Sequence, residues 1–184
     1  LSNGGGGSSK INLHDSGDGA LTIEQTVGGG NFSTATSVRA AIQNKWAHVA
    51  FVREGTGTNE SKLYVNGDLS ATGTVSGNLT GWTGAFRIGR NPEDYSTALD
   101  GYISNFKITH AAVYTSAFTA PTSPLTTTSQ STSASDVKLL TLQSNRFKDN
   151  SLSKFDLEPT GTPRVSVFTP FPNLVSDTSN TQIY

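Results

Sequence analysis

Short alternations of apolar and polar residues, separated by turn-forming residues, run along most of the chain. Residues 10–14 and 20–27 are rich in strand-forming side chains, and the five residues between them combine aspartate, serine and glycine, which favour tight turns. This arrangement predicts an antiparallel hairpin. A second hairpin is predicted over residues 62–75, because the dipeptide Asn66-Gly67 near its middle is favoured in type I′ turns.

The segment 46–53 carries apolar side chains on both faces of an expected strand. Its alternating positions hold Ala47, Val49 and Phe51 on one face and Trp46, His48 and Ala50 on the other. Strands that are buried on both faces lie inside a sheet rather than at its edge. We therefore expect residues 46–53 to form a central strand, in which His48 has a half-buried, structural place.

The second half of the chain predicts further short strands. Residues 85–90 and 101–109 have strand character, and in the second segment Tyr102, Phe106 and Ile108 share a face that should line the core. More strands are expected within residues 137–143, 155–158 and 164–168. Because turn residues recur between about ten such segments, we expect an all-β fold, a two-sheet antiparallel sandwich.

A single domain with appended segments fits the length of 184 residues. Residues 120–136 are rich in proline, serine and threonine and should cross the surface as an extended connector. The expected division is a glycine-rich linker or edge at 1–9, the sandwich at 10–119, the connector at 120–136, C-terminal strands at 137–170 and a tail at 171–184.

The composition narrows the range of partners. Charged residues make up 15% of the chain and the net charge is -1, so the chain lacks the positive field that holds a phosphate backbone. No apolar run reaches the roughly 20 residues needed to cross a bilayer. We expect neither a nucleic-acid partner nor membrane insertion. The absence of cysteine excludes disulfides and thiolate metal sites.

Four motifs follow one another in an order and spacing that resemble a known superfamily. They are Trp46-Ala-His-Val-Ala-Phe-Val-Arg53, Lys62-Leu-Tyr-Val-Asn-Gly67, Phe86-Arg-Ile-Gly89 and Asp100-Gly-Tyr-Ile-Ser-Asn-Phe-Lys-Ile108. Together they are similar to the pattern of the concanavalin A-like, laminin-G-like jelly-roll superfamily. The resemblance implies that the sandwich is a jelly roll, and it is specific for fold rather than for ligand.

A narrower resemblance concerns residues 112–121 and 139–151. These segments look like a subgroup found in virion proteins of marine bacteriophages, cyanophages especially. The family domain usually opens with a strand upstream of the first hairpin, which is missing here, and residues 139–168 resemble that opening segment. The tail therefore either completes this sandwich or begins a following domain. We favour the first, because sandwich edges offer free backbone donors and acceptors to a late strand.

Catalytic chemistry finds little support in the sequence. Glycoside hydrolases of this fold need paired carboxylates on one strand, and no Glu-x-Asp-x-Glu occurs. The adjacent pair Glu93-Asp94 lies in an expected loop and should point its carboxylates apart. No Gly-x-Ser-x-Gly elbow exists, and the histidines are too far apart for a metal site. We expect no enzymatic activity; a glucanase dependent on Glu93 is the contrary hypothesis.

A structural Ca²⁺ is the one cofactor that the resemblance suggests. Laminin-G-like domains often hold one calcium through loop oxygens, and Ca²⁺ takes six to eight of them. The candidate ligands are Asp94, Asn91 and Asp100, with Asp15 and Asp18 second. Each has an alternative explanation, since aspartate and asparagine also stabilise turns through their own side chains.

Carbohydrate binding would need an exposed aromatic platform with amides beside it. Trp82, Tyr95 and Tyr114 fall in expected loops, with Asn91 nearby in sequence, and form the candidate site. Loop aromatics can instead seal the ends of a sandwich, and both interpretations stay open here.

The expected function is that of a non-catalytic bacteriophage virion structural protein, as a capsid decoration or a tail fibre or adhesin domain contacting host-surface glycans. Its expected location is the capsid or tail surface of the virion. Its expected partners are other virion proteins and host-surface polysaccharide, and it should be oligomeric in the particle. The alternative is a carbohydrate-binding module of a larger secreted or surface protein.

Overall fold

The computed structural model describes residues 11–15, 20–25, 30–77, 86–90 and 98–171. One antiparallel sheet contains β1 (Ile11–Asp15), β2 (Leu21–Gln25) and β3 (Phe32–Ser33), and a second contains β4 (Val49–Arg53), β5 (Ser61–Val65) and β6 (Asp68–Gly73). A third, two-stranded sheet pairs β7 (Phe106–Thr109) with β8 (Val137–Thr141). The short helices are η1 (Thr36–Val38), α1 (Arg39–Ile42) and η2 (Ser129–Ser131), and no helix in the described ranges is long and apolar enough to span a membrane.

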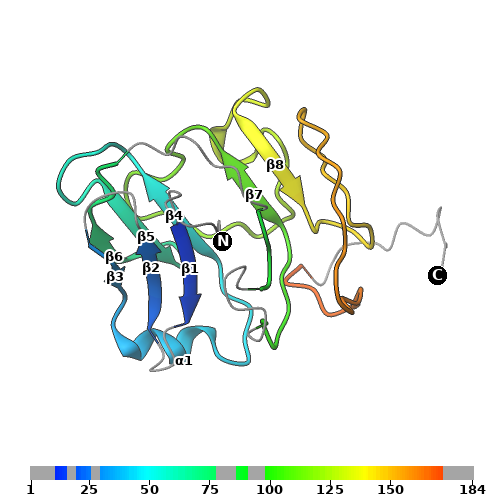
Figure 1. The fold of residues 1–184 in the computed structure, drawn as a ribbon, viewed down its shortest axis with the longest axis horizontal. Coiled ribbons are helices and arrows are strands. Elements are labelled where there is room, and N and C mark those ends of the chain that lie inside the picture. The colour runs from blue at the N-terminus through cyan, green and yellow to red at the C-terminus, as the bar shows by residue number, and fades with distance from the viewer. Residues whose placement is uncertain (1–10, 16–19, 26–29, 78–85, 91–97, 172–184) are drawn as a thin grey trace.

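The first two sheets lie face to face, as Figure 1 shows for β1 and β2 in front of β4 and β5. Their core is built from Leu21 and Ile23 of the first sheet and Leu63 and Val65 of the second, with Val75 closing it. Burying these aliphatic side chains is the main stabilising contribution that the sandwich offers. The expected all-β class and its two antiparallel sheets are confirmed.

The hairpin predicted at Asn66-Gly67 is present and joins β5 to β6. Both turn residues have left-handed backbone, with φ of 54° and 95°, as a type I′ turn requires. A side chain on Gly67 would also collide with the carbonyl of Phe118, whose own N–H donates to the Gly67 carbonyl at 3.1 Å. Glycine is therefore needed here twice, for the turn and for the close approach of residues 118–120. The hairpin between β1 and β2 is also confirmed.

The prediction that residues 46–53 form a central strand is wrong for the described part of the chain. β4 pairs with β5 and ends the sheet order there. Its faces are apolar as expected, because Val49 and Phe51 pack on the core, and ring contacts from Tyr114 and Phe118 cover the opposite face at His48. A strand covered on both faces thus lies at an edge.

Other expected strands are shorter than predicted or absent. Residues 86–90 make only an isolated bridge, Arg90 to Ala98, and no strand covers 155–158 or 164–168. The strand expected from residue 101 begins at Phe106, because Asn105 has left-handed backbone, with φ of 55°, which interrupts the extended conformation. Tyr102 therefore does not line the core with Phe106, and 60% of its surface is exposed.

The segment 120–136, expected to be extended, instead folds around the ammonium group of Lys107. Lys107 Nζ donates to the carbonyl of Ser129 at 2.9 Å, to Thr132 Oγ1 at 2.9 Å and to the carbonyl of Thr126 at 3.2 Å. Serine and threonine hydroxyls add bonds within the loop, including the Thr126 N–H to Ser129 Oγ at 2.9 Å. The polar composition thus supplies oxygen acceptors for one half-buried ammonium group.

The outer edge of β8 is covered by a turn centred on Asp149, of which 2% is exposed. Its carboxylate accepts backbone N–H bonds from Ser151 at 2.8 Å, Leu140 at 3.1 Å and Phe155 at 3.0 Å. Burial alone would raise the pKa of Asp149, but these bonds outweigh it and lower the pKa below its ordinary value. The Asn150 N–H completes the cover by donating to the Leu140 carbonyl at 2.7 Å.

Candidate functional site

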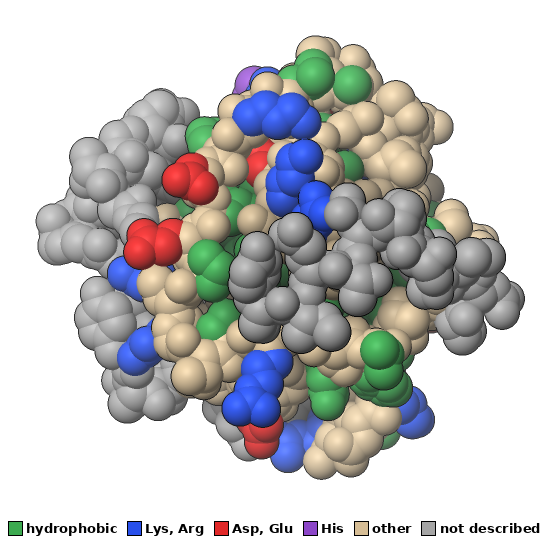
Figure 2. All heavy atoms as spheres, turned by 90° about the vertical axis from the view of Figure 1, so that its right-hand side faces the viewer, with side chains coloured by type: hydrophobic (Ala, Val, Ile, Leu, Met, Phe, Trp, Pro, Cys, Tyr) green, Lys and Arg blue, Asp and Glu red, His purple; other side chains and the backbone are tan. Residues whose placement is uncertain are grey.

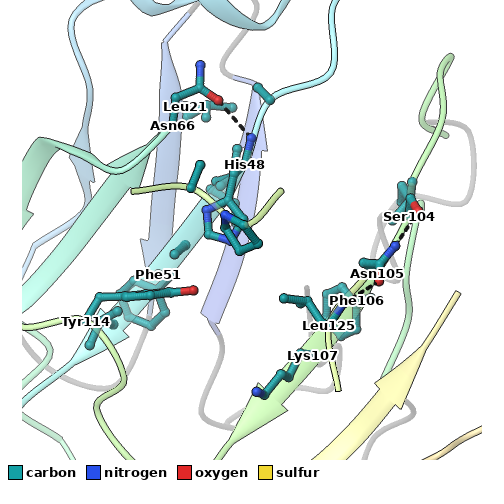
Figure 3. Close-up of a pocket in the computed structure, with 18 of the residues that line it drawn as sticks. Leu21, His48, Phe51, Asn66, Ser104, Asn105, Phe106, Lys107, Tyr114 and Leu125 are labelled. Atoms are coloured by element: carbon teal, nitrogen blue, oxygen red, sulfur yellow. Dashed lines mark hydrogen bonds between the residues drawn. The ribbon is translucent and has the colours of Figure 1, made fainter. Parts of the chain in front are cut away.

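A groove of about 2110 Å³ lies between β4 and β7. Figure 3 shows His48 and Phe51 on one side of it and Ser104 to Lys107 on the other. Its described lining also takes in residues 99–114, Leu125 and Phe168. Most of these side chains are apolar, so the groove combines a hydrophobic floor with a polar rim, as binding sites commonly do.

Three aromatic rings from distant parts of the chain meet at this groove; we call Trp46, Tyr102 and Phe168 the aromatic cluster. The Trp46 and Phe168 rings stack with centroids 5.2 Å apart, and Tyr102 approaches them at 6.3 Å and 5.0 Å. Tyr102 is 60% exposed and Phe168 is 53% exposed. The cluster therefore presents ring surface to solvent while the rings fix one another's orientation.

Two buried aromatic-ring nitrogens of the lining have no hydrogen-bond partner in the described structure. They are Trp46 Nε1 and His48 Nδ1. Buried polar atoms normally have a partner, so these two nitrogens are exceptions among the described residues. Burial lowers the pKa of His48 below 6.5, which favours a neutral imidazole at neutral pH.

The rim of the groove near β7 is held by side chain to backbone bonds. Asn105 Oδ1 accepts the Leu125 N–H at 2.8 Å, and Asn105 Nδ2 lies 2.8 Å from Ser104 Oγ. These bonds tie the 120–136 segment to the strand that borders the groove. Burial lowers the pKa of Lys107, but the oxygens around its ammonium group still provide it with acceptors.

Of the four residues predicted to bind sugar, only Tyr114 lies within the described residues. The other three, Trp82, Tyr95 and Asn91, lie outside them. Tyr114 is half-buried and stacks on Phe118 with centroids 3.5 Å apart and planes 6° apart. Its edge contacts reach His48 and Tyr64, and burial raises its pKa to about 12. Tyr114 thus belongs to the packing that covers the outer face of β4 and β5.

The calcium candidates are not brought together by the described residues. Asp94, Asn91 and Asp18 lie outside these residues, the Asp15 side chain is not described, and Asp100 is exposed. Within the described part of the chain no group of three or more His, Cys, Asp or Glu side chains could hold a metal ion. The calcium site stays a prediction.

The acidic side chains of the described lining are Glu54 and Asp100. Glu54 is engaged in an ion pair with Lys62 of β5. Glu93, the residue on which a glucanase hypothesis depends, lies outside the described residues.

Sequence analysis missed the aromatic cluster. Trp46 and Tyr102 were assigned to strand faces, and Phe168 lies far along the chain in a segment expected to be a strand. No local pattern marks three residues that meet only in the tertiary structure.

Two packed antiparallel sheets, built from short hairpins and bordered by an apolar groove, define an all-β sandwich domain. The family model of the concanavalin A-like lectin/glucanases superfamily matches residues 1–121, and the chain belongs to this superfamily. The resemblance inferred from the four motifs is thereby confirmed at the level of the superfamily. No curated protein and no solved structure matches the chain.

Proposed function

We propose that this domain is a non-catalytic binding module that attaches to surface carbohydrate through the aromatic cluster. The observation that carries the proposal is the exposure of Tyr102 and Phe168 beside the groove, with Trp46 stacked behind them. Sugar rings present apolar C–H faces that pack on aromatic rings. The superfamily's name, which includes lectins, supports the same class of ligand.

Polar groups beside the cluster would orient such a ligand. Ser104 and Asn105 stand on the facing side of the groove (Figure 3). A few fixed polar groups around an apolar floor give orientation and specificity.

The proposal of a non-catalytic role rests on the acidic residues available. Glycoside hydrolysis needs two carboxyl groups about 5 to 9.5 Å apart, one of them acting as an acid. The carboxylates of the described lining are Glu54, which is paired with Lys62, and the exposed Asp100.

The biological setting that we propose is a bacteriophage virion, with the domain on the capsid or tail surface as a decoration, fibre or adhesin. The resemblance of residues 112–121 and 139–151 to virion proteins of marine bacteriophages supports it. Its partners there are other virion proteins and host-surface polysaccharide. Oligomeric display on a particle multiplies a weak single-site affinity, which suits a shallow aromatic surface. The second candidate setting is a carbohydrate-binding module of a secreted or surface protein.

The test is a glycan array probed with the full chain, followed by calorimetry on any hit with Tyr102→Ala and Phe168→Ala. Each variant should weaken binding about tenfold, because a lost stacking contact and its buried area together are worth more than 1 kcal/mol. The matched control is Phe155→Ala, since Phe155 is 59% exposed and lies outside the cluster. Equal losses for the control, or no glycan bound at all, would contradict the proposal.

The setting is tested separately by electron cryomicroscopy of intact particles from the source. Density for the sandwich at fixed positions would support the virion role. Its absence would favour the free carbohydrate-binding module.

A further inference from the structure

β4 has one strand edge without a partner among the described residues. The Asn66 N–H donates to the His48 carbonyl at 2.8 Å and the Glu54 N–H to the Glu60 carbonyl at 2.8 Å. In an antiparallel pair the hydrogen-bonded residues alternate, so the even-numbered residues of β4 bond to β5. The N–H and C=O groups of Val49, Phe51 and Arg53 therefore point to the opposite edge, which borders the groove.

β7 presents a matching open edge. Leu140 of β8 turns its N–H and C=O to the outer edge of that strand, where Asp149 and Asn150 bond to them, so Leu140 and its partner Lys107 form a non-hydrogen-bonded pair. The backbone N–H and C=O of Lys107 consequently point away from β8, and no described strand pairs with them. Lys107 lines the same groove as β4.

The side chains around these edges are those of a sheet interior. β4 is covered on both faces, by the core and by the Tyr114 and Phe118 rings. Figure 1 shows β4 and β7 as separate strands on the two sides of the molecule's centre. Unpaired, flat, apolar strand edges are unusual at a protein surface and are templates for an added strand.

The charged side chains that line the groove indicate what kind of segment could bind there. Lys45 donates to the Ala40 carbonyl, and Arg53 donates to the carbonyls of Val75 and Gly77, so neither cation has a described carboxylate partner. Glu54 is neutralised by Lys62, while Lys107 bonds only neutral oxygens. The described lining thus has an excess of positive charge that an acidic segment would complement.

We propose that the groove between β4 and β7 is a β-strand acceptor site, occupied by an extended segment of a partner protein in which apolar residues alternate with acidic ones. The backbone of the segment bonds to Val49, Phe51 and Arg53, its apolar side chains fill the groove, and its carboxylates face Lys45 and Arg53. The proposal does not rest on glycan binding, although the aromatic cluster lines the same groove.

The probe is a fluorescein-labelled nine-residue peptide that alternates glutamate with valine and isoleucine, titrated with the full 184-residue chain by fluorescence anisotropy. Binding should weaken at least about tenfold when two alternate peptide nitrogens are methylated, because each methyl removes a backbone donor. A peptide with lysine in place of glutamate should bind at least about fivefold more weakly. Equal binding of all three peptides would overturn the proposal.

A pair of matched variants locates the peptide. Lys45→Glu should weaken binding of the acidic peptide about threefold or more, whereas Lys138→Glu should not change it. Both lysines are exposed and donate to a backbone carbonyl, but Lys138 lies outside the groove. An equal effect of the two substitutions would overturn the assignment to this groove.

Hydrogen exchange tests the open edge directly. The amides of Val49, Phe51 and Arg53 should exchange fast in the free chain and slow at least about tenfold with the peptide bound. Protection in the free monomeric chain would show that the edge is already paired and would overturn the proposal. If these amides become protected as the protein concentration rises, and light scattering shows dimers, then a second copy of the chain occupies the edge. That result would also overturn the proposal of a partner protein.

Discussion

Removing the carboxylate of Asp149 should destabilise the C-terminal half of the molecule more than any other single polar change that we describe. In Asp149→Ala the buried N–H groups of Leu140 and Ser151 lose their acceptor, while the N–H of the exposed Phe155 can turn to water. An unsatisfied buried donor costs about 1–3 kcal/mol, so the free energy of unfolding should fall by about 3 kcal/mol. Asp149→Asn keeps one acceptor oxygen and should lose about half as much.

The assay is equilibrium urea unfolding of both variants, followed by tryptophan fluorescence. Asp156→Asn is the control, because Asp156 is an exposed carboxylate on the same segment, and its effect should stay within about 0.5 kcal/mol. A loss below about 1 kcal/mol in Asp149→Ala, or one no larger than that of the control, would refute the assignment of Asp149 as the acceptor that holds this turn.

Acidification gives the same test without a mutation. Because the pKa of Asp149 is lower in the folded than in the unfolded chain, its contribution is fully present above the unfolded value of about 3.9 and is lost as pH falls through the folded value. Asp149→Asn should flatten the unfolding free energy against pH below about pH 4. An unchanged acid slope in the variant would contradict this origin.

Three further outcomes are expected. Gly67→Ala should lower the unfolding free energy by about 3 kcal/mol, because the new side chain meets both a left-handed φ and the carbonyl of Phe118. Gly161→Ala, where φ is 79° and the surrounding space is open, should lower it by only about 1 kcal/mol. Equal losses in the two variants would show that the clash at Gly67 contributes nothing. Lys107→Met should destabilise by about 2 kcal/mol and speed amide exchange in residues 126–132, unlike Lys138→Met, and no difference between them would contradict the loop's dependence on that ammonium. Because burial lowers the pKa of His48, the unfolded chain takes up its proton more readily, so stability should fall as pH drops below about 6.5, and His48→Phe should lack that slope in pH-dependent urea unfolding.

Local chemistry made the hairpins predictable. The turn between β5 and β6 is specified by two adjacent residues, Asn66 and Gly67. The alternation of apolar and polar residues on either side of it specifies which faces of the two strands are apolar. The same alternation gave the correct two-faced cover of β4 but the wrong place in the sheet, because strand pairing depends on partners far away in sequence. Sequence patterning therefore predicted the faces of this strand and not its edges.

The candidate site was less accessible to sequence reasoning. Asn105 interrupts an apparently continuous strand because asparagine tolerates left-handed backbone, and this turns Tyr102 out towards solvent. Tyr102 then meets Trp46 and Phe168, which only the tertiary fold brings near. The prediction that residues 120–136 are extended failed for a similar reason, since no local sequence pattern shows that oxygens of this segment surround Lys107.

The C-terminal face shows how polar and apolar surface is distributed outside the groove. Figure 2 shows Lys and Arg side chains spread among neutral polar surface, with hydrophobic side chains in several separate groups. Exposed apolar residues of the C-terminal segment include Leu152, Phe155 and Val165. The described part of the face in Figure 2 therefore shows dispersed apolar groups rather than one continuous apolar platform.

Lys107 gives the 126–132 loop a cation that is part of the covalent chain. Loops rich in oxygen ligands are commonly organised by a bound metal ion, and their shape then follows the free concentration of that ion and is lost to chelators. Here the ammonium group meets three oxygens of the loop, at 2.9, 2.9 and 3.2 Å. This part of the surface should therefore keep its form in media stripped of divalent ions, and acetylation of that one amine would have the effect that a chelator has on a calcium loop.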